Sequence, residues 1–466
     1  MRGHLATRGQ ATSRRTFLRH AGLMGAGAVV SAGVLGRLDP IRLAYAQPTS
    51  GTVRIGIRGA DGALEAGAVE VSGDGIFTIR SSKGDGDVLK LDGNQIATIA
   101  AEGDTFRVAG GGKSAMLAGS VQVASSEAGA AVLQVVNGKG YPYRGRFDVT
   151  AGVSGGVVLV NVLDVDSYVA GVAAKEISPS FGIEPLRAQA IAARSYAFGR
   201  RASGIHKNLG IDVCDSQHCQ VYGGMVAEHP LGNGAVEATS GMILLRSGAV
   251  FEPMYSSTCG GHTESISRAF GNGSDDEAVA DGELPAGGSL LTEAGAMTFF
   301  KGVWASNCAG SNRYRWSYTW DRSELEAAIA AGLQRFAGNS SLSSSGTDER
   351  VASVTGISIA ERGVSGRALA LKVEAPGVEW TVKRALSVQN FLRAPDGSPL
   401  PSSAFALEQV RGGDGKLAGV IAYGAGWGHG AGMCQWGMRG LAQKGLAYDA
   451  ILGHYYPSAD IAKVSV

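Results

Sequence analysis

The sequence has almost no net charge and, after residue 46, no long hydrophobic run. Its 42 Lys and Arg residues against 41 Asp and Glu residues leave a formal charge of +1 over 466 residues. Binding to nucleic acid relies on an excess of positive charge that is missing here, and a transmembrane helix needs a longer apolar segment. With 44% hydrophobic residues, the composition indicates a globular protein of two or three domains without a nucleic-acid partner.

Glycine is in excess, at 71 of 466 residues, yet two patterns that often explain such an excess are missing. There is no collagen-like period, so the glycines indicate many turns and strand connections. Glycines alternate with other residues over 424–432, but no lysine follows at the spacing of a phosphate-binding loop. This segment is instead typical of backbone that approaches another surface closely.

The first 46 residues have the features of an export signal. Residues 13–18 read SRRTFL, a twin-arginine pattern, and a mildly apolar stretch of small residues follows. Ala44-Tyr45-Ala46 is typical of a cleavage site. We predict export by the twin-arginine route to the periplasm or cell envelope, with no stable membrane span in the mature chain. An uncleaved anchor is the alternative.

Hydrophobic patterning predicts an α+β fold that is rich in β-strands. Short alternating runs separated by Gly and Asp turns over residues 52–125 predict a small N-terminal antiparallel β domain. Residues 157–163 form an apolar, β-branched run that is typical of a buried strand. A central helical segment should follow and carry the functional site, and a closing helix is expected over residues 441–456.

One carboxylate in the helical segment is placed for acid chemistry. The first helix is expected from Ser167 to about Lys175, with Asp166 as its N-cap, and Pro179 prevents its continuation. Glu176 then sits at the C-terminal end, where the helix dipole disfavours an ionised carboxylate and partial burial adds to the effect. We therefore predict a raised pKa for Glu176, which suits a general acid. An ordinary helix-end carboxylate is the alternative.

Three stretches resemble the stage II sporulation protein D family. SYVAGVAAKEISPSF with PLRAQAIAARSYA, over residues 167–197, looks like the core motif of the family. DVCDSQHCQVYGG at 212–224 is similar to its metal-site segment, and residues 424–457, which begin GAGWGHGAGMCQWG, are similar to its glycine-rich C-terminal signature. Members of the family are bacterial proteins that act on cell-wall peptidoglycan as lytic transglycosylases, with relatives called amidase enhancers.

The resemblance implies an activity and its partners. It makes Glu176 the catalytic residue of a lytic transglycosylase, which protonates the glycosidic oxygen and then takes the proton of the C6 hydroxyl as 1,6-anhydro-MurNAc forms. The implied substrate is the peptidoglycan glycan strand, including peptide-free strands. The alternative is a non-catalytic amidase enhancer that binds glycan and recruits or activates an amidase. A zinc hydrolase is a third, weaker hypothesis.

Four residues could bind a metal ion. His206, Cys214, His218 and Cys219 supply two imidazoles and two thiolates, a full tetrahedral set for Zn²⁺. A full set leaves no open position, so the expected zinc is structural and holds the loop near Glu176. The alternatives are a disulfide between Cys214 and Cys219 and a rival ligand pair, Cys259 and His262. Cys308 is expected to be a free or buried thiol.

Several polar side chains are candidates for binding the glycan. Ser256, Ser257 and Thr258 lie in a hydroxyl-rich loop that resembles one of the family, and their hydroxyls suit contacts to sugars. The alternative is a turn that uses these hydroxyls to cap its own backbone. The other candidates, for which structural roles are the alternative, are Arg187, Arg194, Tyr222, His429 and Gln435.

The predicted domain organisation has five parts. Residues 340–346, which read SSLSSSG, are of low complexity and fall in a predicted insertion. A helix is expected within the same insertion over Arg322–Phe336. The five parts are a signal peptide (1–46), a small β domain (47–130), the first part of the catalytic core (131–282), the insertion (283–350) and the second part of the core (351–466).

Overall fold

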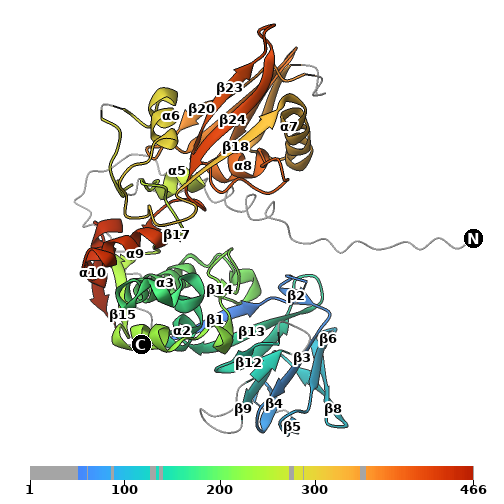
Figure 1. Cartoon of the computed structure of the whole chain (residues 1–466). Helices are drawn as coiled ribbons and strands as arrows, with labels where there is room; N and C mark the ends of the chain where they lie inside the picture. The colour runs from blue at the N-terminus through green and yellow to red at the C-terminus, as the bar shows by residue number, and fades with distance from the viewer. Residues whose placement is uncertain are drawn as a thin grey trace, which may run out of the picture. The chain divides into compact units, whose positions relative to one another are not determined.

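The computed structural model divides the chain into two compact units (Figure 1). The first ends at Glu252 and takes up the chain again from Asp460, and the second comprises Pro253–Ala459. The residues described by the structure are 51–59, 61–84, 89–125, 133–135, 140–271, 278–286, 288–346 and 353–464. The predicted export signal lies outside them, and among them no helix is long and apolar enough to cross a membrane.

The first unit contains two large sheets and confirms the β-rich α+β prediction. The eight-stranded sheet has the order β14-β1-β13-β12-β9-β4-β5, with β2 paired to β13. Its strands are β1 (Thr52–Ile57), β2 (Glu65–Ala66), β4 (Phe77–Ser81), β5 (Leu89–Leu91), β9 (Val121–Ser125), β12 (Arg146–Ala151), β13 (Val157–Asp164) and β14 (Val213–Cys214). The six-stranded sheet runs β11-β10-β3-β6-β7-β8. These strands are β3 (Ala68–Gly73), β6 (Ala97–Glu102), β7 (Thr105–Gly110), β8 (Lys113–Ala118), β10 (Leu133–Val135) and β11 (Pro142–Tyr143).

The predicted buried strand is the centre of the larger sheet. β13 pairs with both β1 and β12 in antiparallel register, and every residue of it except the last is buried. Strands of the N-terminal segment therefore share one sheet with the strand that leads into the helical segment. The first helix therefore starts at the end of a strand that is paired on both sides.

Three helices follow β13 in the first unit: α2 (Val165–Glu176), α3 (Ile183–Ser203) and α4 (Pro230–Ala238). The predicted cap of α2 was wrong. Asp164 is the N-cap and accepts a hydrogen bond from the Ser167 N–H at 2.8 Å, whereas Asp166 lies inside the first turn. A small sheet of β16 (Ala249–Val250), β15 (Met242–Arg246) and β26 (Asp460–Lys463) completes the unit.

The second unit is built on two antiparallel sheets that share a core. One has the order β19-β22-β21-β20 and the other β18-β24-β23. Trp320, Ile329, Leu371, Phe391 and Val420 belong to one buried cluster that joins both sheets to α7 and α8. The elements are β18 (Arg315–Asp321), α7 (Arg322–Phe336), β19 (Leu342–Gly346), β20 (Gly356–Arg362), β21 (Ala368–Ala375), β22 (Val378–Lys383), α8 (Ala385–Phe391), β23 (Phe405–Arg411) and β24 (Leu417–Ala425).

The predicted insertion is part of these sheets. Its helix is confirmed as α7, which opens with a capping box between Asp321 and Glu324. The serine-rich run forms β19 and pairs with β22, and β18 pairs with β24. Strands on both sides of the predicted boundary at residue 350 therefore pair with one another, so the predicted insertion and the residues after it fold together.

Shorter elements carry the remaining motifs of the second unit. They are β17 (Tyr255–Ser256), α5 (Ile266–Phe270), α6 (Glu293–Lys301), β25 (Met433–Cys434), α9 (Gln435–Gln443) and α10 (Tyr448–Tyr455). The single closing helix predicted over residues 441–456 was wrong. Gly445 takes a positive φ of 88° after the end of α9, and this left-handed residue turns the chain into α10.

Candidate functional site

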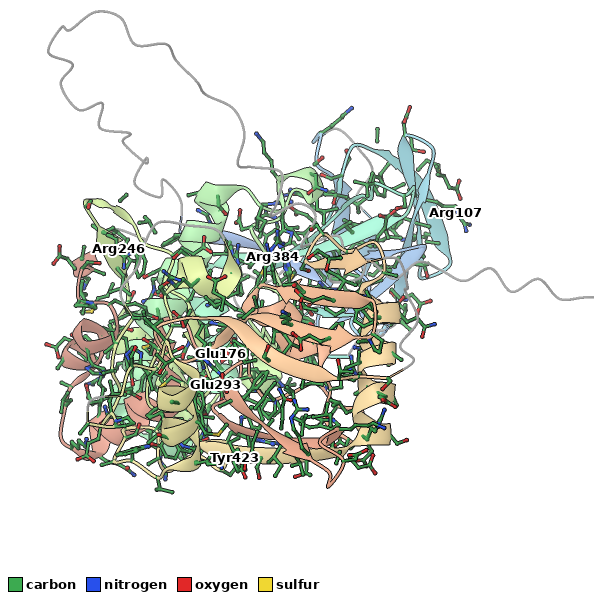
Figure 2. All side chains as sticks on the ribbon, turned by 90° about the horizontal axis from the view of Figure 1, so that it is seen from above. Arg107, Glu176, Arg246, Glu293, Arg384 and Tyr423 are labelled. Atoms are coloured by element: carbon green, nitrogen blue, oxygen red, sulfur yellow. The ribbon has the colours of Figure 1, made fainter. Side chains whose placement is uncertain are left out.

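Glu176 is the last residue of α2, as the sequence predicted. Its side chain is half-buried, and Figure 2 labels its place in the chain. The Glu176 Oε1 accepts a hydrogen bond from the backbone N–H of Val221 at 3.0 Å. A carboxylate held by a backbone donor keeps its position, which acid–base chemistry requires. The raised pKa of Glu176 stays a prediction.

The segment that supplies this donor lies along α2. The Tyr168 hydroxyl donates to the side-chain oxygen of Gln220 at 2.9 Å, and the Gly223 N–H donates to the carbonyl of Gly171 at 3.1 Å. A Cβ at position 171 would stand 2.5 Å from the ring of Tyr222. Glycine is therefore needed at this point of α2 for the segment to approach so closely.

Tyr222 itself is a core residue, which corrects its predicted role in substrate binding. The side chain is 4% exposed, and its hydroxyl donates to the Asn161 side-chain oxygen at 2.9 Å. Burial raises the pKa of this phenol far above its usual value of 10. The tyrosine therefore joins α2 and β13 rather than meeting a sugar.

Arg194 also has a structural environment. Its guanidinium is wholly buried in α3 and donates to Asp166 Oδ1 at 2.8 and 2.6 Å and to the carbonyl of Met242 at 2.9 Å. Ser240 donates to the other oxygen of Asp166 at 2.5 Å. These bonds join α2, α3 and β15, so the prediction that Arg194 contacts substrate was wrong. Arg187 is a third exposed and pairs with Glu184 at 2.7 Å; its contact with substrate stays a prediction.

The four predicted metal ligands come together. One ligand atom from each of His206, Cys214, His218 and Cys219 lies within 4.8 Å of the others. His206 Nε2 is 3.2 Å from Cys219 Sγ, and His218 Nδ1 is 3.5 and 3.6 Å from Cys219 Sγ and Cys214 Sγ. In a tetrahedral zinc site with bonds of about 2.0 to 2.3 Å, neighbouring ligand atoms stand about 3.3 to 3.8 Å apart. The donor set and its spacing therefore fit Zn²⁺.

The scaffold on both sides of this cluster is well defined. Cys214 lies in β14, which pairs in parallel with β1, and Arg58 points a guanidinium nitrogen at Cys214 Sγ from 3.8 Å. Both cysteines are free thiols rather than a disulfide. Cys219 is two residues from Val221, so the cluster borders the segment that holds Glu176.

The remaining glycan-binding candidates lie in the second unit. Thr258 is fully buried, and its hydroxyl is 2.9 Å from that of Ser311. Ser257 Oγ is 3.4 Å from Thr258 Oγ1. Ser256 is 6% exposed, and its buried hydroxyl makes no hydrogen bond to the described part of the chain. Gln435 is 8% exposed at the start of α9.

The glycine-rich motif passes directly beside this hydroxyl-rich loop. Trp427 and Thr258 exchange two backbone hydrogen bonds, at 2.9 and 3.3 Å. A Cβ at Gly426 would stand 2.5 Å from the Thr258 carbonyl, and one at Gly430 would stand 2.0 Å from the Arg367 guanidinium. The alternating glycines thus serve close backbone approach. His429 is half-buried, and its Nδ1 accepts from the Ala431 N–H at 3.0 Å.

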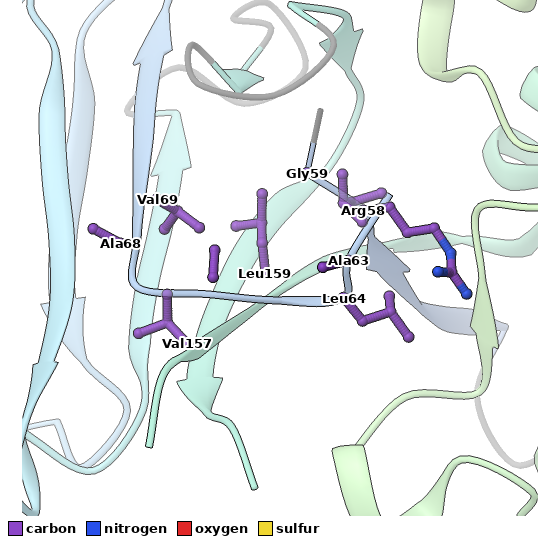
Figure 3. A pocket seen from close by; sticks show the side chains of 10 residues that line it. Arg58, Gly59, Ala63, Leu64, Ala68, Val69, Val157 and Leu159 are labelled. Carbon is purple, nitrogen blue, oxygen red and sulfur yellow. The ribbon is translucent and has the colours of Figure 1, made fainter. Parts of the chain in front are cut away.

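The first unit has two surface hollows, and Glu176 does not line either of them. The smaller, of about 30 Å³, is lined mostly by apolar side chains such as Val69, Val157 and Leu159 (Figure 3). It is too small for a sugar ring, since ligand pockets measure about 300 Å³ or more. The wider depression, of about 310 Å³, is lined by polar groups that include Arg144, Asp164 and Glu228.

Sequence reasoning missed one group of residues. Asp281, Cys308 and Cys434 gather around Cys259, with ligand atoms within 4.8 Å of one another. The rival pair of Cys259 with His262 does not form, because the His262 ring meets the Thr263 carbonyl at 2.7 Å while Cys259 contacts Asp281. The cysteines are spread over 175 positions, so no spacing motif signalled this cluster.

Two family models match the chain. Residues 153–245 match the one described as Stage II sporulation protein, a range that contains Glu176 and the His206 cluster. Residues 288–432 match one described as a domain of unknown function.

The chain is also similar to three proteins of known sequence. It is 29% identical over 305 residues to an uncharacterised protein of Brachyspira hyodysenteriae, covering 66% of this chain and 68% of that protein. It is 26% identical to the amidase enhancer of Bacillus subtilis, over 62% of this chain and 40% of that protein. It is 24% identical to stage II sporulation protein D of the same organism, over 65% of this chain and 76% of that protein.

Proposed function

The chain carries a domain of the stage II sporulation protein D family, and on that premise we propose that it is an exported peptidoglycan lytic transglycosylase. The bond cleaved is the glycosidic bond between MurNAc and GlcNAc in glycan strands. The products carry 1,6-anhydro-MurNAc ends. Both the substrate and the reaction are those that the motif resemblance implies.

The observation that carries the proposal is the position of Glu176. It ends α2 and is half-buried, and the Val221 N–H fixes one of its oxygens. In the proposed reaction the Glu176 carboxylic acid protonates the glycosidic oxygen as the bond from that oxygen to C1 breaks. The resulting carboxylate accepts the proton of the C6 hydroxyl, whose oxygen bonds to C1. Glu176 ends the cycle protonated, and no water is consumed.

The motif stretches favour this route over hydrolysis. Ordinary glycoside hydrolysis needs two carboxylates, one as acid and one as base or nucleophile. Among the carboxylates, the resemblance assigns a catalytic role to Glu176 alone. A single acid/base suffices for transglycosylation, because the substrate's own hydroxyl takes the place of water.

We also propose that the His206 cluster binds a structural zinc ion. Two thiolates and two imidazoles fill a tetrahedral shell, so the ion has no open position for substrate. Its contribution is to hold residues 206–219 and, through them, the donor at Val221. A chelator that stopped turnover while leaving the fold and this loop intact would contradict a structural role.

The proposed reaction predicts a product that mass spectrometry distinguishes. The mature chain from Gln47 onward is incubated with purified peptide-free glycan strands, beside a Glu176→Gln variant. We expect new 1,6-anhydro ends from the wild type and at least a hundredfold fewer from the variant, because general acid catalysis contributes about 10² to 10⁴ in rate. Reducing ends would contradict transglycosylation and require a second carboxylate. Equal anhydro yield from the variant would contradict the role of Glu176.

An amidase-enhancer function is the second candidate, favoured by the similarity to the protein of that name. In that case the chain retains glycan strands on a pull-down, cuts nothing, and raises the rate of an amidase added to the same strands. Glu176→Gln would then leave the stimulation unchanged.

A further inference from the structure

The second unit holds a cluster of metal-ligating side chains that is separate from the His206 cluster. It consists of Cys259, Asp281, Cys308 and Cys434, each of which offers one ligand atom, and all four atoms lie within 4.8 Å of one another. We propose that these residues bind a second zinc ion, through three thiolates and one carboxylate.

The sulfur–sulfur distance matches tetrahedral coordination, and the sulfur–oxygen distance is a few tenths of an ångström shorter. Cys259 Sγ is 3.7 Å from Cys308 Sγ and 3.2 Å from Asp281 Oδ2. With Zn–S bonds of about 2.3 Å and Zn–O bonds of about 2.0 to 2.2 Å, tetrahedral neighbours stand about 3.5 to 3.8 Å apart. Thiolates select soft or borderline cations such as Zn²⁺ over Mg²⁺ and Ca²⁺.

Burial gives a physical reason for a cation. Asp281, Cys308 and Cys434 are wholly buried, and Cys259 is 2% exposed. A buried carboxylate is costly unless it is paired or coordinates a metal. Among the ion pairs of the described residues, Asp281 has no Lys or Arg partner. Its one ionisable partner there is His454, whose Nε2 lies 3.3 Å from Asp281 Oδ1.

The carboxylate is oriented in the way that metal ligands usually are. Asp281 Oδ1 accepts hydrogen bonds from the Tyr455 hydroxyl at 2.8 Å and from the Asn307 side chain at 2.9 Å. These bonds leave Oδ2 directed at Cys259 Sγ. Outer partners that fix a ligand's direction in this manner typically raise metal affinity by one to two orders of magnitude.

The sulfur atoms receive similar support from the backbone. Cys434 Sγ accepts from the N–H groups of Cys259 at 3.1 Å and Gly437 at 3.3 Å. A Cβ at Gly437 would stand 1.9 Å from the Tyr455 hydroxyl and 2.6 Å from Asp281 Oδ2. Hydrogen bonds to sulfur stabilise the thiolate form that binds metal.

The proposed ion would join four segments of the second unit. Cys259 follows β17 in the hydroxyl-rich loop, Asp281 precedes α6, Cys308 precedes β18, and Cys434 caps α9. The loop of Thr258 and the glycine-rich motif thereby meet at one point. This role in holding the unit together does not depend on the proposed reaction at Glu176.

Metal counting tests the proposal directly. The mature chain is produced in a reducing cytoplasm, dialysed against metal-free buffer, and analysed for zinc by mass spectrometry. We expect two zinc ions per chain in the wild type and one in Cys308→Ser. Cys214→Ser, which changes the other cluster, is the matched control and should also retain one. The double variant should retain none.

Cobalt replacement gives an independent readout. In the Cys214→Ser background, Co²⁺ should produce the sulfur-to-metal absorption of a three-thiolate site. That band should be lost in the double variant. A circular dichroism spectrum establishes that each variant is folded. If Cys308→Ser does not fold, Asp281→Asn replaces it in the zinc measurement. Asp281→Asn should release zinc to a chelator at least tenfold faster than the wild type.

Three results would overturn the proposal. The first is that Cys308→Ser binds as much zinc as the wild type. The second is a wild-type mass two hydrogens below that of the reduced chain, with Cys259 and Cys308 in one non-reduced peptide, which means a disulfide. Iron with an iron–sulfur absorption would assign the site to a cluster instead.

Discussion

Gly171 controls how closely the segment that positions Glu176 approaches α2. A Cβ here would stand 2.5 Å from the Tyr222 ring and 3.0 Å from the Gly224 carbonyl. In an exposed helix, alanine would be the better residue by about 1 kcal/mol. At this position the steric conflict opposes that preference, because both neighbours belong to the packed interior.

We predict that Gly171→Ala lowers the free energy of unfolding by about 1 to 3 kcal/mol, the usual cost of overpacking. Gly234→Ala is the matched control, since Gly234 lies in α4 and a Cβ there meets nothing within 4 Å. The control should raise the free energy of unfolding by about 0.5 to 1 kcal/mol. Urea titration measures both. A destabilisation of equal size in the two variants would contradict the close approach.

His429 makes the stability of the second unit depend on pH. Burial, followed by the positive charge of Arg367, lowers the pKa of His429 from 6.5 to about 4. The unfolded chain therefore takes up a proton at higher pH than the folded chain does, so the free energy of unfolding falls as the pH drops from about 6.5 to about 4. The stabilising contribution is fully present above pH 6.5.

We expect His429→Gln to remove about 1 to 3 kcal/mol of the difference in unfolding free energy between pH 7 and pH 4.5. The measurement is urea unfolding of wild type and variant at both pH values. Comparing the two proteins cancels the contribution of the other titrating groups. Parallel pH profiles would contradict the lowered pKa of His429.

At the scale of elements, the segment from His206 to Gly223 connects the proposed zinc ion to Glu176. It begins after α3, pairs with β1 through β14, and returns along α2. Few backbone hydrogen bonds of regular structure hold it, because β14 has two residues. Side-chain ligation of an ion would therefore contribute much of its order.

Removing that ion should loosen the segment. In Cys214→Ser we expect amide hydrogen exchange of residues 212–224 to become at least tenfold faster, while β13 exchanges as in the wild type. Hydrogen–deuterium exchange with peptide mass spectrometry measures both. Cys308→Ser, in the other cluster, is the control and should leave residues 212–224 unchanged. Unaltered exchange in Cys214→Ser would mean that the segment keeps its structure without the ion.

At the scale of the whole molecule, each compact unit contains its own cluster of metal-ligating residues. Folding in the reducing cytoplasm would keep all five cysteines available as ligands, and the twin-arginine route is expected to carry folded proteins. Export by that route and metal loading are therefore compatible.

The predicted route has its own test. Replacing Arg14 and Arg15 together by lysine should leave at least a tenfold smaller share of the protein in the cell envelope, because the twin-arginine pattern is lost. Cell fractionation and immunoblotting measure the distribution. The matched control replaces Arg8, outside the pattern, by lysine. Unchanged export of the double variant would contradict the twin-arginine prediction.

Local signals in the sequence were enough to predict several elements and one cluster. The apolar run of β13, the helix over Arg322–Phe336 and the position of Glu176 before Pro179 depend on neighbouring residues only. The ligands His206, Cys214, His218 and Cys219 lie close in sequence, so their meeting was predictable as well. Helix ends were less so, since Asp164 and Asp166 are equally good caps by residue type.

The sequence by itself determined the family resemblance, the candidate acid and the first cluster, because each depends on short stretches of residues that lie near one another in the chain. Only the tertiary structure decided what the dispersed side chains do. It buried Arg194 against Asp166 and Tyr222 against Asn161, which removed both from the glycan-binding set. It also brought Asp281, Cys308 and Cys434 to Cys259. These contacts join residues that are 22 to 175 positions apart. They depend on strand pairing and packing, and no local pattern contains that information.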